Sequence, residues 1–252
     1  MPLVIWLNLR YNDHNNLLEL LIMKEHIYTI PVTEAFSEHK SGCPFCALFE
    51  KLERDELEII LGASMMEPDV RSETNRLGFC KRHYSKMFSM KNRLGLALML
   101  ESHLESLKKE LKTGNIFSRD IAQKSIDRIE KLNNSCYVCT RIEDKISKMF
   151  TTAAYLFNEE KEFRKDFSEV RYFCLDHYRE YMLAAKRVLS KDDYVELVRA
   201  ANEKVCAYLD SLKDDVSLFC KKFDYRFDDL PWGESKDSVE RSIKFLTGDD
   251  FK

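Results

Sequence analysis

The segment Cys43-Pro44-Phe45-Cys46 is followed by Phe79-Cys80-Lys81-Arg82-His83-Tyr84, and both motifs then occur again in the same order. The second occurrences are Cys136-Tyr137-Val138-Cys139 and Phe173-Cys174-Leu175-Asp176-His177-Tyr178. The first motif shifts from position 43 to 136 and the second from 80 to 174, so the two copies differ by one residue of loop. Self-similarity of this kind indicates a duplicated structural unit.

These motifs hold six of the eight cysteines and two of the six histidines. Each copy contains three cysteines and one histidine, and the eight predicted metal ligands are Cys43, Cys46, Cys80, His83, Cys136, Cys139, Cys174 and His177. Residues three apart lie on one face of a helix, so a Cys-x-x-His pair can supply half of a tetrahedron. We expect pairing within each copy, with exchange of ligands between the copies as the alternative.

A site of three cysteines and one histidine fills the preferred tetrahedral coordination of zinc and leaves no position for water or substrate. We therefore predict two structural zinc ions. Thiolate-rich ligation disfavours magnesium and calcium, but it also suits an iron-sulfur cluster, which is the alternative cofactor. A thioredoxin-like redox pair would require a neighbouring βαβ pattern, and the sequence shows none.

The composition favours helices, because the chain contains only 7 glycines and 5 prolines among 252 residues. Apolar residues at helical spacing follow both Cys-x-x-Cys motifs; they are Leu48, Leu52, Ile59 and Ile60 in the first copy and Ile142, Ile146, Met149 and Phe150 in the second. One long helix is expected from His83 to Gly114, with its buried stripe at Leu100, Leu104, Leu107 and Leu111. The predicted fold is all-α, a helical bundle built from the two metal-binding repeats and an irregular C-terminal tail.

Residues 1–22 are expected to form an N-terminal extension, either disordered or upstream of a true start at Met23. Residues 23–252 are expected to form one helical domain, with the first repeat at about 40–114, the second at about 133–200, and a C-terminal helix and tail at about 201–252. The aromatic tail is expected to pack back over the bundle rather than bind another chain. Cys206 and Cys220 are expected to be buried free thiols.

The formal net charge of −3 gives no strong field for attracting nucleic acid, so a nucleic-acid partner is not favoured. No stretch reaches the roughly 18 consecutive apolar residues of a membrane helix, and residues 1–22 lack an export signal, so we expect a cytoplasmic protein. The usual nucleotide-binding and hydrolase motifs are missing. The favoured function is a non-enzymatic, zinc-stabilised scaffold that binds a protein partner; the alternative is an iron-sulfur or thiol-based redox protein or enzyme.

Three features together resemble a bacterial family catalogued only as domain of unknown function 6062. They are the stretch from Met23 to Phe36, the duplicated cysteine and histidine motifs, and the tail from Phe223 to Gly248. The resemblance covers nearly everything after residue 22. It implies a bacterial cytosolic protein whose family-like start is Met23, and it implies no particular activity.

Overall fold

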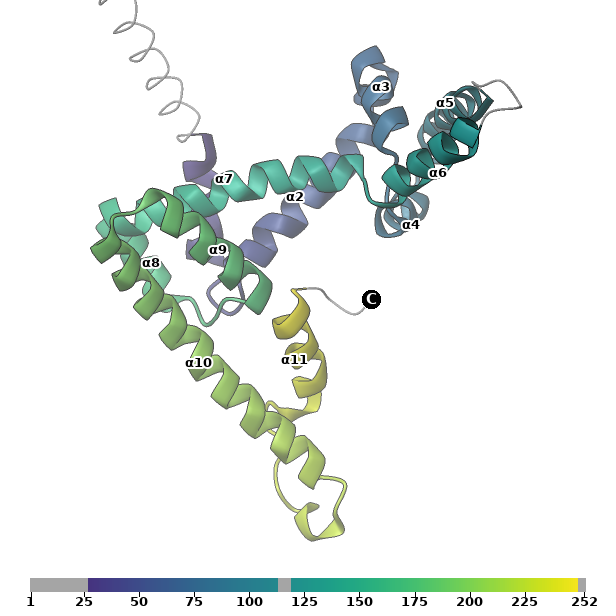
Figure 1. Cartoon of the computed structure of the whole chain (residues 1–252). Helices are drawn as coiled ribbons and strands as arrows, with labels where there is room; N and C mark the ends of the chain where they lie inside the picture. Colours follow the sequence, from purple (N-terminus) through teal and green to yellow (C-terminus); the bar gives the residue numbers. More distant parts are fainter. Residues whose placement is uncertain (1–26, 113–118, 249–252) are drawn as a thin grey trace, which may run out of the picture. The chain divides into compact units, whose positions relative to one another are not determined.

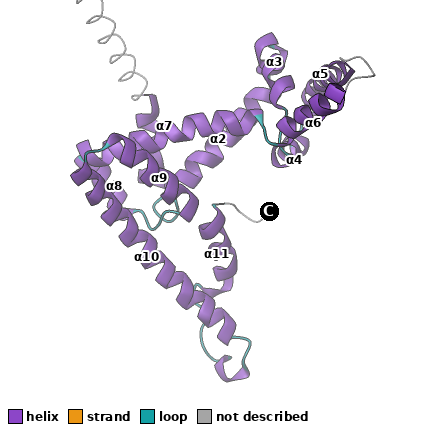
Figure 2. Ribbon diagram, viewed as in Figure 1, coloured by secondary structure: helices purple, strands orange, loops and turns teal. Residues whose placement is uncertain are grey.

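The computed structural model describes residues 27–112 and 119–248, and these residues form helices and connecting loops without a strand (Figures 1 and 2). The prediction of an all-α fold is confirmed. The expected N-terminal extension at 1–22 and the expected helix end at Gly114 lie outside the described residues.

The chain divides into two compact units. Of the described residues, the first unit comprises 27–48 and 146–248, and the second comprises those between 49 and 145. Both boundaries fall inside helices, one in α2 (Pro44–Leu61) and the other in α7 (Tyr137–Glu159). The compact units therefore do not coincide with the two sequence copies, since each unit takes one Cys-x-x-Cys motif and the Cys-x-x-His motif of the other copy.

The second unit packs α3 against α5 and α6. Besides the parts of α2 and α7 that belong to it, its elements are η1 (Ala63–Met66), α3 (Pro68–Leu77), α4 (Lys81–Ser89), α5 (Arg93–Lys112) and α6 (Arg119–Asn133). Arg128 on α6 donates to the carbonyl oxygens of Asn75 and Arg76 at 3.0 and 3.1 Å. It also forms an ion pair with Glu110 on α5, so one side chain joins three helices.

The prediction of one continuous helix from His83 is wrong, because α4 ends at Ser89 and a separate helix, α5, begins at Arg93. Asn92 starts the new helix: its side-chain oxygen accepts the backbone N–H of Gly95 at 2.9 Å, as a helix-capping side chain does. The expected leucine stripe is only partly covered, since Leu100, Leu107 and Leu111 are half-buried. Leu104 is 62% exposed, whereas Leu96 and Met99 carry the buried face of α5.

The first unit is organised around a cluster of aromatic rings. Its elements are the helical residues 27–38, the start of α2, most of α7, α8 (Lys161–Glu169), α9 (Leu175–Val188), α10 (Lys191–Lys221), η2 (Tyr225–Phe227), η3 (Ser235–Asp237) and α11 (Ser238–Thr247). Phe36 lies at the centre of the cluster, with ring centroids at 4.6 Å from Phe163 and 5.4 Å from Phe45. All three rings are buried, so helices distant in sequence share one core.

The tail folds back over the first unit, and α11 packs against both α9 and α10. Phe245 is fully buried, with its ring centroid 5.8 Å from that of Tyr172 and 5.3 Å from that of Tyr208. The expectation that the tail packs onto the bundle is confirmed for α11. By contrast, Phe223 and Tyr225 remain 78% and 82% exposed.

Cys206 and Cys220 both lie on α10, and both are exposed, so the expectation of burial is wrong. The two cysteines are exposed because they lie outside the buried face of α10. That face consists of Leu197, Ala201, Val205, Tyr208 and Leu212. Among the described residues, every helix is too short or too polar to cross a membrane.

Candidate metal centres

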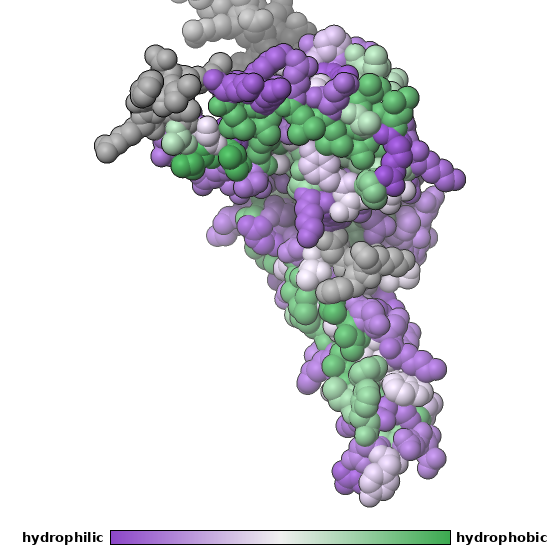
Figure 3. All heavy atoms as spheres, turned by 90° about the vertical axis from the view of Figure 1, so that its right-hand side faces the viewer, coloured by the Kyte–Doolittle hydropathy of each residue, from purple (hydrophilic) through white to green (hydrophobic). Residues whose placement is uncertain are grey.

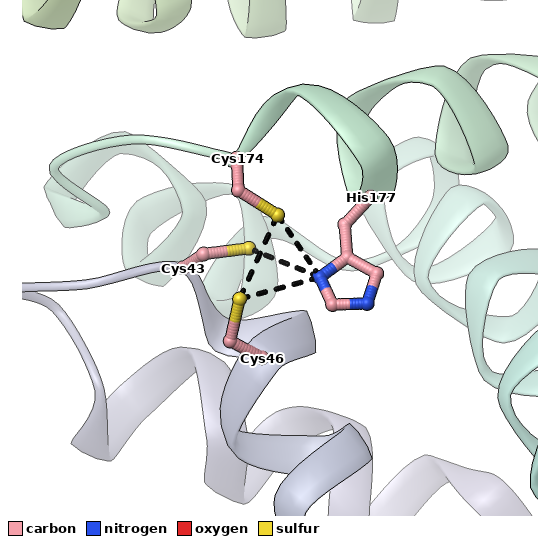
Figure 4. Close-up of side chains that lie close together, drawn as sticks. All are labelled: Cys43, Cys46, Cys174 and His177. Atoms are coloured by element: carbon pink, nitrogen blue, oxygen red, sulfur yellow. Dashed lines mark hydrogen bonds between the residues drawn. The ribbon is translucent and has the colours of Figure 1, made fainter. Parts of the chain in front are cut away.

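Four predicted ligands meet in the first unit (Figure 4). This first cluster consists of Cys43, Cys46, Cys174 and His177. The Sγ atoms of Cys46 and Cys174 are 3.6 Å apart, and the Nδ1 of His177 lies 3.1, 3.4 and 3.8 Å from the sulfurs of Cys174, Cys46 and Cys43. All three cysteines are buried.

The other four ligands meet in the second unit. This second cluster consists of Cys80, His83, Cys136 and Cys139. The Nδ1 of His83 is 3.1 Å from Cys136 Sγ, 3.2 Å from Cys80 Sγ and 3.4 Å from Cys139 Sγ. Cys80 and Cys139 are only partly buried, so this cluster is the more accessible of the two. In each cluster the four candidate ligand atoms lie within 4.8 Å of one another, so each could hold a metal ion.

The expected pairing of ligands within each sequence copy is wrong. The Cys-x-x-Cys motif of each copy joins the Cys-x-x-His motif of the other copy. The physical reason is helix length: at about 1.5 Å per residue, the 18 residues of α2 and the 23 residues of α7 carry the chain far from the cysteines with which those helices begin. The next Cys-x-x-His motif therefore belongs to the other compact unit.

Backbone hydrogen bonds hold the two ligand loops of each cluster together. In the first unit, the N–H of Arg171 donates to the carbonyl of Lys40 at 2.8 Å, just ahead of Cys174 and Cys43. In the second unit, the N–H of Tyr137 donates to the carbonyl of Gly78 at 2.9 Å. The exchanged pairing is thus built into the main chain as well as into the side chains.

Every ligand lies at the start of a helix. Cys80 and Cys174 are the N-cap residues of α4 and α9, with extended backbone conformations, and each histidine follows in the first turn. The two Cys-x-x-Cys motifs lie at the starts of α2 and α7. Unpaired N–H groups give a helix N-terminus partial positive charge, which stabilises thiolates and so favours metal binding.

The thiols of each cluster do not ionise alike. Burial opposes ionisation of Cys43, but hydrogen bonds from Cys174 and Cys46 outweigh it and hold its pKa well below the usual value. Hydrogen bonding to Cys174 and Cys43 raises the pKa of Cys46 instead. In the second cluster, the hydrogen bond from Cys139 lowers the pKa of Cys136 to about 3, and the same contact raises that of Cys139.

These opposed shifts mean that each cluster readily holds one thiolate, while a second thiolate beside it is disfavoured by repulsion. A divalent cation would reverse that preference, because its charge favours deprotonation of every coordinating thiol. The donor set and its electrostatics therefore fit a bound cation.

Glu53, which no sequence motif indicated, contacts the second cluster. Glu53 lies on α2 and is buried at 3% exposure, and its Oε1 is 3.1 Å from His83 Nε2, on the opposite side of the ring from the sulfurs. It also pairs with Lys86 and, at 3.1 Å, with Arg82 Nε. The only feature of the sequence that could have indicated this contact is a glutamate next to apolar helix positions. Many surface glutamates have the same surroundings in sequence, so this feature does not identify a buried one.

The electrostatics of this contact favour an ionised carboxylate. Burial of Glu53 opposes ionisation, but hydrogen bonds from His83 and Lys86 and the charge of Arg82 outweigh it and lower the pKa to about 2. Burial likewise opposes protonation of His83, but hydrogen bonds to Cys136 and Glu53 raise its pKa to about 9. Because an ionised carboxylate only accepts hydrogen bonds, Nε2 of His83 carries a proton and Nδ1 faces the sulfurs.

Two further histidines of the described part of the chain, His39 and His103, belong to neither cluster. The Nδ1 of His103 is buried without a hydrogen-bond partner among the described residues, and burial lowers the pKa of this imidazole. It therefore behaves as a neutral histidine packed beside Gly78.

The fold and the two clusters define an all-α protein with two separate Cys3His sites, each able to hold a metal ion. The chain belongs to the family of unknown function DUF6062, which it matches over residues 23–252, nearly its whole length. This match confirms the resemblance noted in the sequence and begins at Met23. No curated protein and no solved structure matches the chain.

Proposed function

We propose that the protein binds two zinc ions, one in each cluster, as structural sites. The observation that carries this proposal is the spacing of the ligand atoms. Zinc-sulfur bonds of about 2.3 Å in a tetrahedron place two sulfurs about 3.8 Å apart. The sulfurs of Cys46 and Cys174 are 3.6 Å apart in the first cluster, and those of Cys80 and Cys139 are 3.9 Å apart in the second.

The donor set supports a structural rather than a catalytic ion. Three cysteines and one histidine complete the zinc coordination, so no position is left at which a substrate or water could be activated. The alternative, an iron-sulfur cluster, has the same thiolate preference. The spacing favours a single ion over such a cluster, because all four ligand atoms of each site lie within 4.8 Å of one another, close enough for direct bonds to one ion.

The experiment is elemental analysis of untagged protein prepared without oxygen, on the wild type and on two double variants. We expect about two zinc ions per wild-type chain and no visible absorption. Cys46→Ser with Cys174→Ser damages only the first cluster, so this variant is expected to keep one ion. Cys46→Ser with Cys80→Ser damages both clusters, although both changes lie in one sequence copy, and it is expected to keep none.

The control is the variant in which the two exposed cysteines, Cys206 and Cys220, are both changed to serine. It is expected to bind as many zinc ions per chain as the wild type does. A wild-type protein without stoichiometric metal would refute the proposal. A brown protein containing iron and acid-labile sulfide would replace zinc with the iron-sulfur alternative. If the variant with Cys46→Ser and Cys80→Ser lost only one ion, and the variant with Cys46→Ser and Cys174→Ser lost two, the exchanged pairing would be refuted as the arrangement in solution.

We further propose that this body acts as a scaffold for a protein partner in the bacterial cytoplasm. The support is the exposure of Phe223 and Tyr225 in the tail, since exposed aromatic side chains commonly anchor interfaces. Figure 3 shows further hydrophobic residues along the part that holds α10 and α11, where Leu209, Val216 and Leu246 line a groove. The free thiols fit a reducing compartment.

The partner proposal is tested by cross-linking in growing cells, followed by identification of the captured proteins. Phe223→Ser with Tyr225→Ser is expected to keep the metal content and lose a specific partner that the wild type captures. Recovery of the same proteins in the same amounts with both chains would contradict the assignment of this surface.

A further inference from the structure

We propose that Glu53 is a positioning residue for His83 and that it makes the second cluster a tighter metal site than its sulfur and nitrogen ligands alone would form. This inference rests on the proposed metal binding, and it concerns a side chain outside both predicted ligand sets. The carboxylate accepts the Nε2–H of His83 at 3.1 Å. Accepting that proton fixes the tautomer in which Nδ1 is free to coordinate the ion.

The geometry leaves the imidazole little freedom. Nδ1 of His83 lies 3.1 to 3.4 Å from three sulfurs, and Nε2, on the far side of the ring, meets the carboxylate. His83 is 2% exposed, so no bulk water competes for either nitrogen. Losing the carboxylate would leave a buried N–H unsatisfied and the ring free to rotate.

Glu53 is itself held in place by two cations. Arg82 and Lys86, both on α4 with His83, pair with its two oxygens. The cations offset the negative charge that Glu53 would otherwise add beside three thiolates. A buried carboxylate with this arrangement costs less than an isolated one, and it can supply electron density to the imidazole when the ion binds.

The neighbouring residue Glu56 shows what a purely structural carboxylate looks like here. Glu56 lies one turn further along α2, is 1% exposed, and pairs with Lys145 and, at 2.8 Å, with Arg141 Nε. It has the same charge, burial and number of cationic partners as Glu53, but the contacts of its carboxylate are to cations rather than to a metal ligand. Glu56 is therefore a matched control for the role of Glu53.

The duplicated copy lacks an acidic residue at the corresponding position. Glu53 and Ile146 each stand seven residues after the second cysteine of a Cys-x-x-Cys motif, Cys46 and Cys139. Around His177 the structure places the rings of Phe45 and Phe150, with centroids 6.3 and 5.9 Å from the imidazole. The effect of changing Glu53 is therefore confined to the second cluster.

The test is a competition titration with Zn²⁺ against a chromophoric chelator, using Glu53→Gln, Glu53→Ala and the control Glu56→Gln. Loss of a carboxylate behind a zinc-bound histidine typically weakens binding by about 10- to 100-fold. We expect that loss for one of the two ions in Glu53→Ala, and a smaller loss in Glu53→Gln, whose amide oxygen still accepts the Nε2–H. Glu56→Gln is expected to keep both wild-type affinities.

Two single-site backgrounds assign the effect. Cys46→Ser leaves only the second cluster intact, and there Glu53→Gln is expected to lower Zn²⁺ affinity and to alter the visible absorption of bound Co²⁺. Cys139→Ser leaves only the first cluster intact, and there Glu53→Gln is expected to change neither. The Co²⁺ spectrum reports the ligand sphere itself, which a general loss of stability would not alter.

The outcomes separate this inference from the proposed function. If the wild type binds two ions and Glu53→Ala binds both with unchanged affinity, the positioning role is refuted and metal binding stands. Equal losses in Glu53→Gln and Glu56→Gln would refute it as well, since removal of any buried carboxylate on α2 would then have the same effect. A wild type that binds no metal would refute the positioning role together with the proposed function.

Discussion

At the scale of single residues, the two clusters depend on a few positions whose chemistry cannot be exchanged. The ligands are one such group, and Gly78 is another. Gly78 stands two residues before Cys80 with φ 61° and ψ −161°, a combination that residues other than glycine hardly adopt. Its carbonyl accepts the N–H of Tyr137, so this turn joins the two ligand loops of the second cluster.

Gly78→Ala is expected to reduce the free energy of unfolding by about 1–3 kcal/mol, because the backbone becomes strained. An added Cβ would also lie only 3.1 Å from Leu132 Cδ2. The measurement is denaturant unfolding of the metal-loaded protein, followed by secondary structure.

Gly42→Ala is the control, since Gly42 is next to Cys43 but has ordinary φ and nothing within 4 Å of an added Cβ. It is expected to change stability by less than about 0.5 kcal/mol, as substitutions that disturb no contact usually do. A Gly78 variant as stable as the Gly42 variant would show that the turn is not strained.

At the scale of elements, the ligand motifs define where helices begin. Pro44 lies at the first position of α2, where its missing N–H costs nothing. Cys80 and Cys174 occupy N-cap positions without a side-chain cap hydrogen bond, and their sulfurs lie in the clusters instead. The helix N-terminus thus stabilises a thiolate, and the coordinated thiolate in turn would stabilise the helix N-terminus.

Helix faces were predicted unevenly. Ile142 and Phe150 on α7 are buried as their spacing indicates, because they pack in the cores of the compact units. Leu104 on α5 is exposed despite equally regular spacing. Periodicity identifies a helix with an apolar face, but whether that face is covered depends on neighbouring helices, and α5 packs through Leu96 and Met99 instead.

At the scale of the whole molecule, each compact unit contains one complete cluster. The first unit consists of two segments separated by the entire second unit, and a metal ion bound to Cys46 and Cys174 would join these segments directly. In the second unit, an ion bound to Cys80 and Cys139 would close a loop that contains most of the unit. Each ion would thus act as a long-range cross-link.

Removal of both ions is therefore expected to lower the thermal midpoint by roughly 10–20 °C. Zinc contributes about 10–16 kcal/mol in small peptides. Even about 5 kcal/mol corresponds to such a shift in a chain of this size, at about 2–4 °C per kcal/mol. Circular dichroism melts before and after treatment with a strong chelator measure the effect, and added zinc is expected to restore the original midpoint.

The serine variant of Cys206 and Cys220 should respond to the chelator as the wild type does, since both thiols are exposed and distant in sequence from the ligands. An identical midpoint with and without bound metal would show that the clusters do not stabilise the fold.

The sequence by itself determined the helical class and the eight candidate ligands, because both depend on local spacing: residues three apart share the first turn of a helix, and the duplication distinguishes these six cysteines and two histidines from the others. Only the tertiary structure decided which motifs pair and that Glu53 contacts His83. Both the pairing and this contact depend on the path that the chain follows along α2 and α7. Helix packing fixes that path, and motif spacing does not encode it.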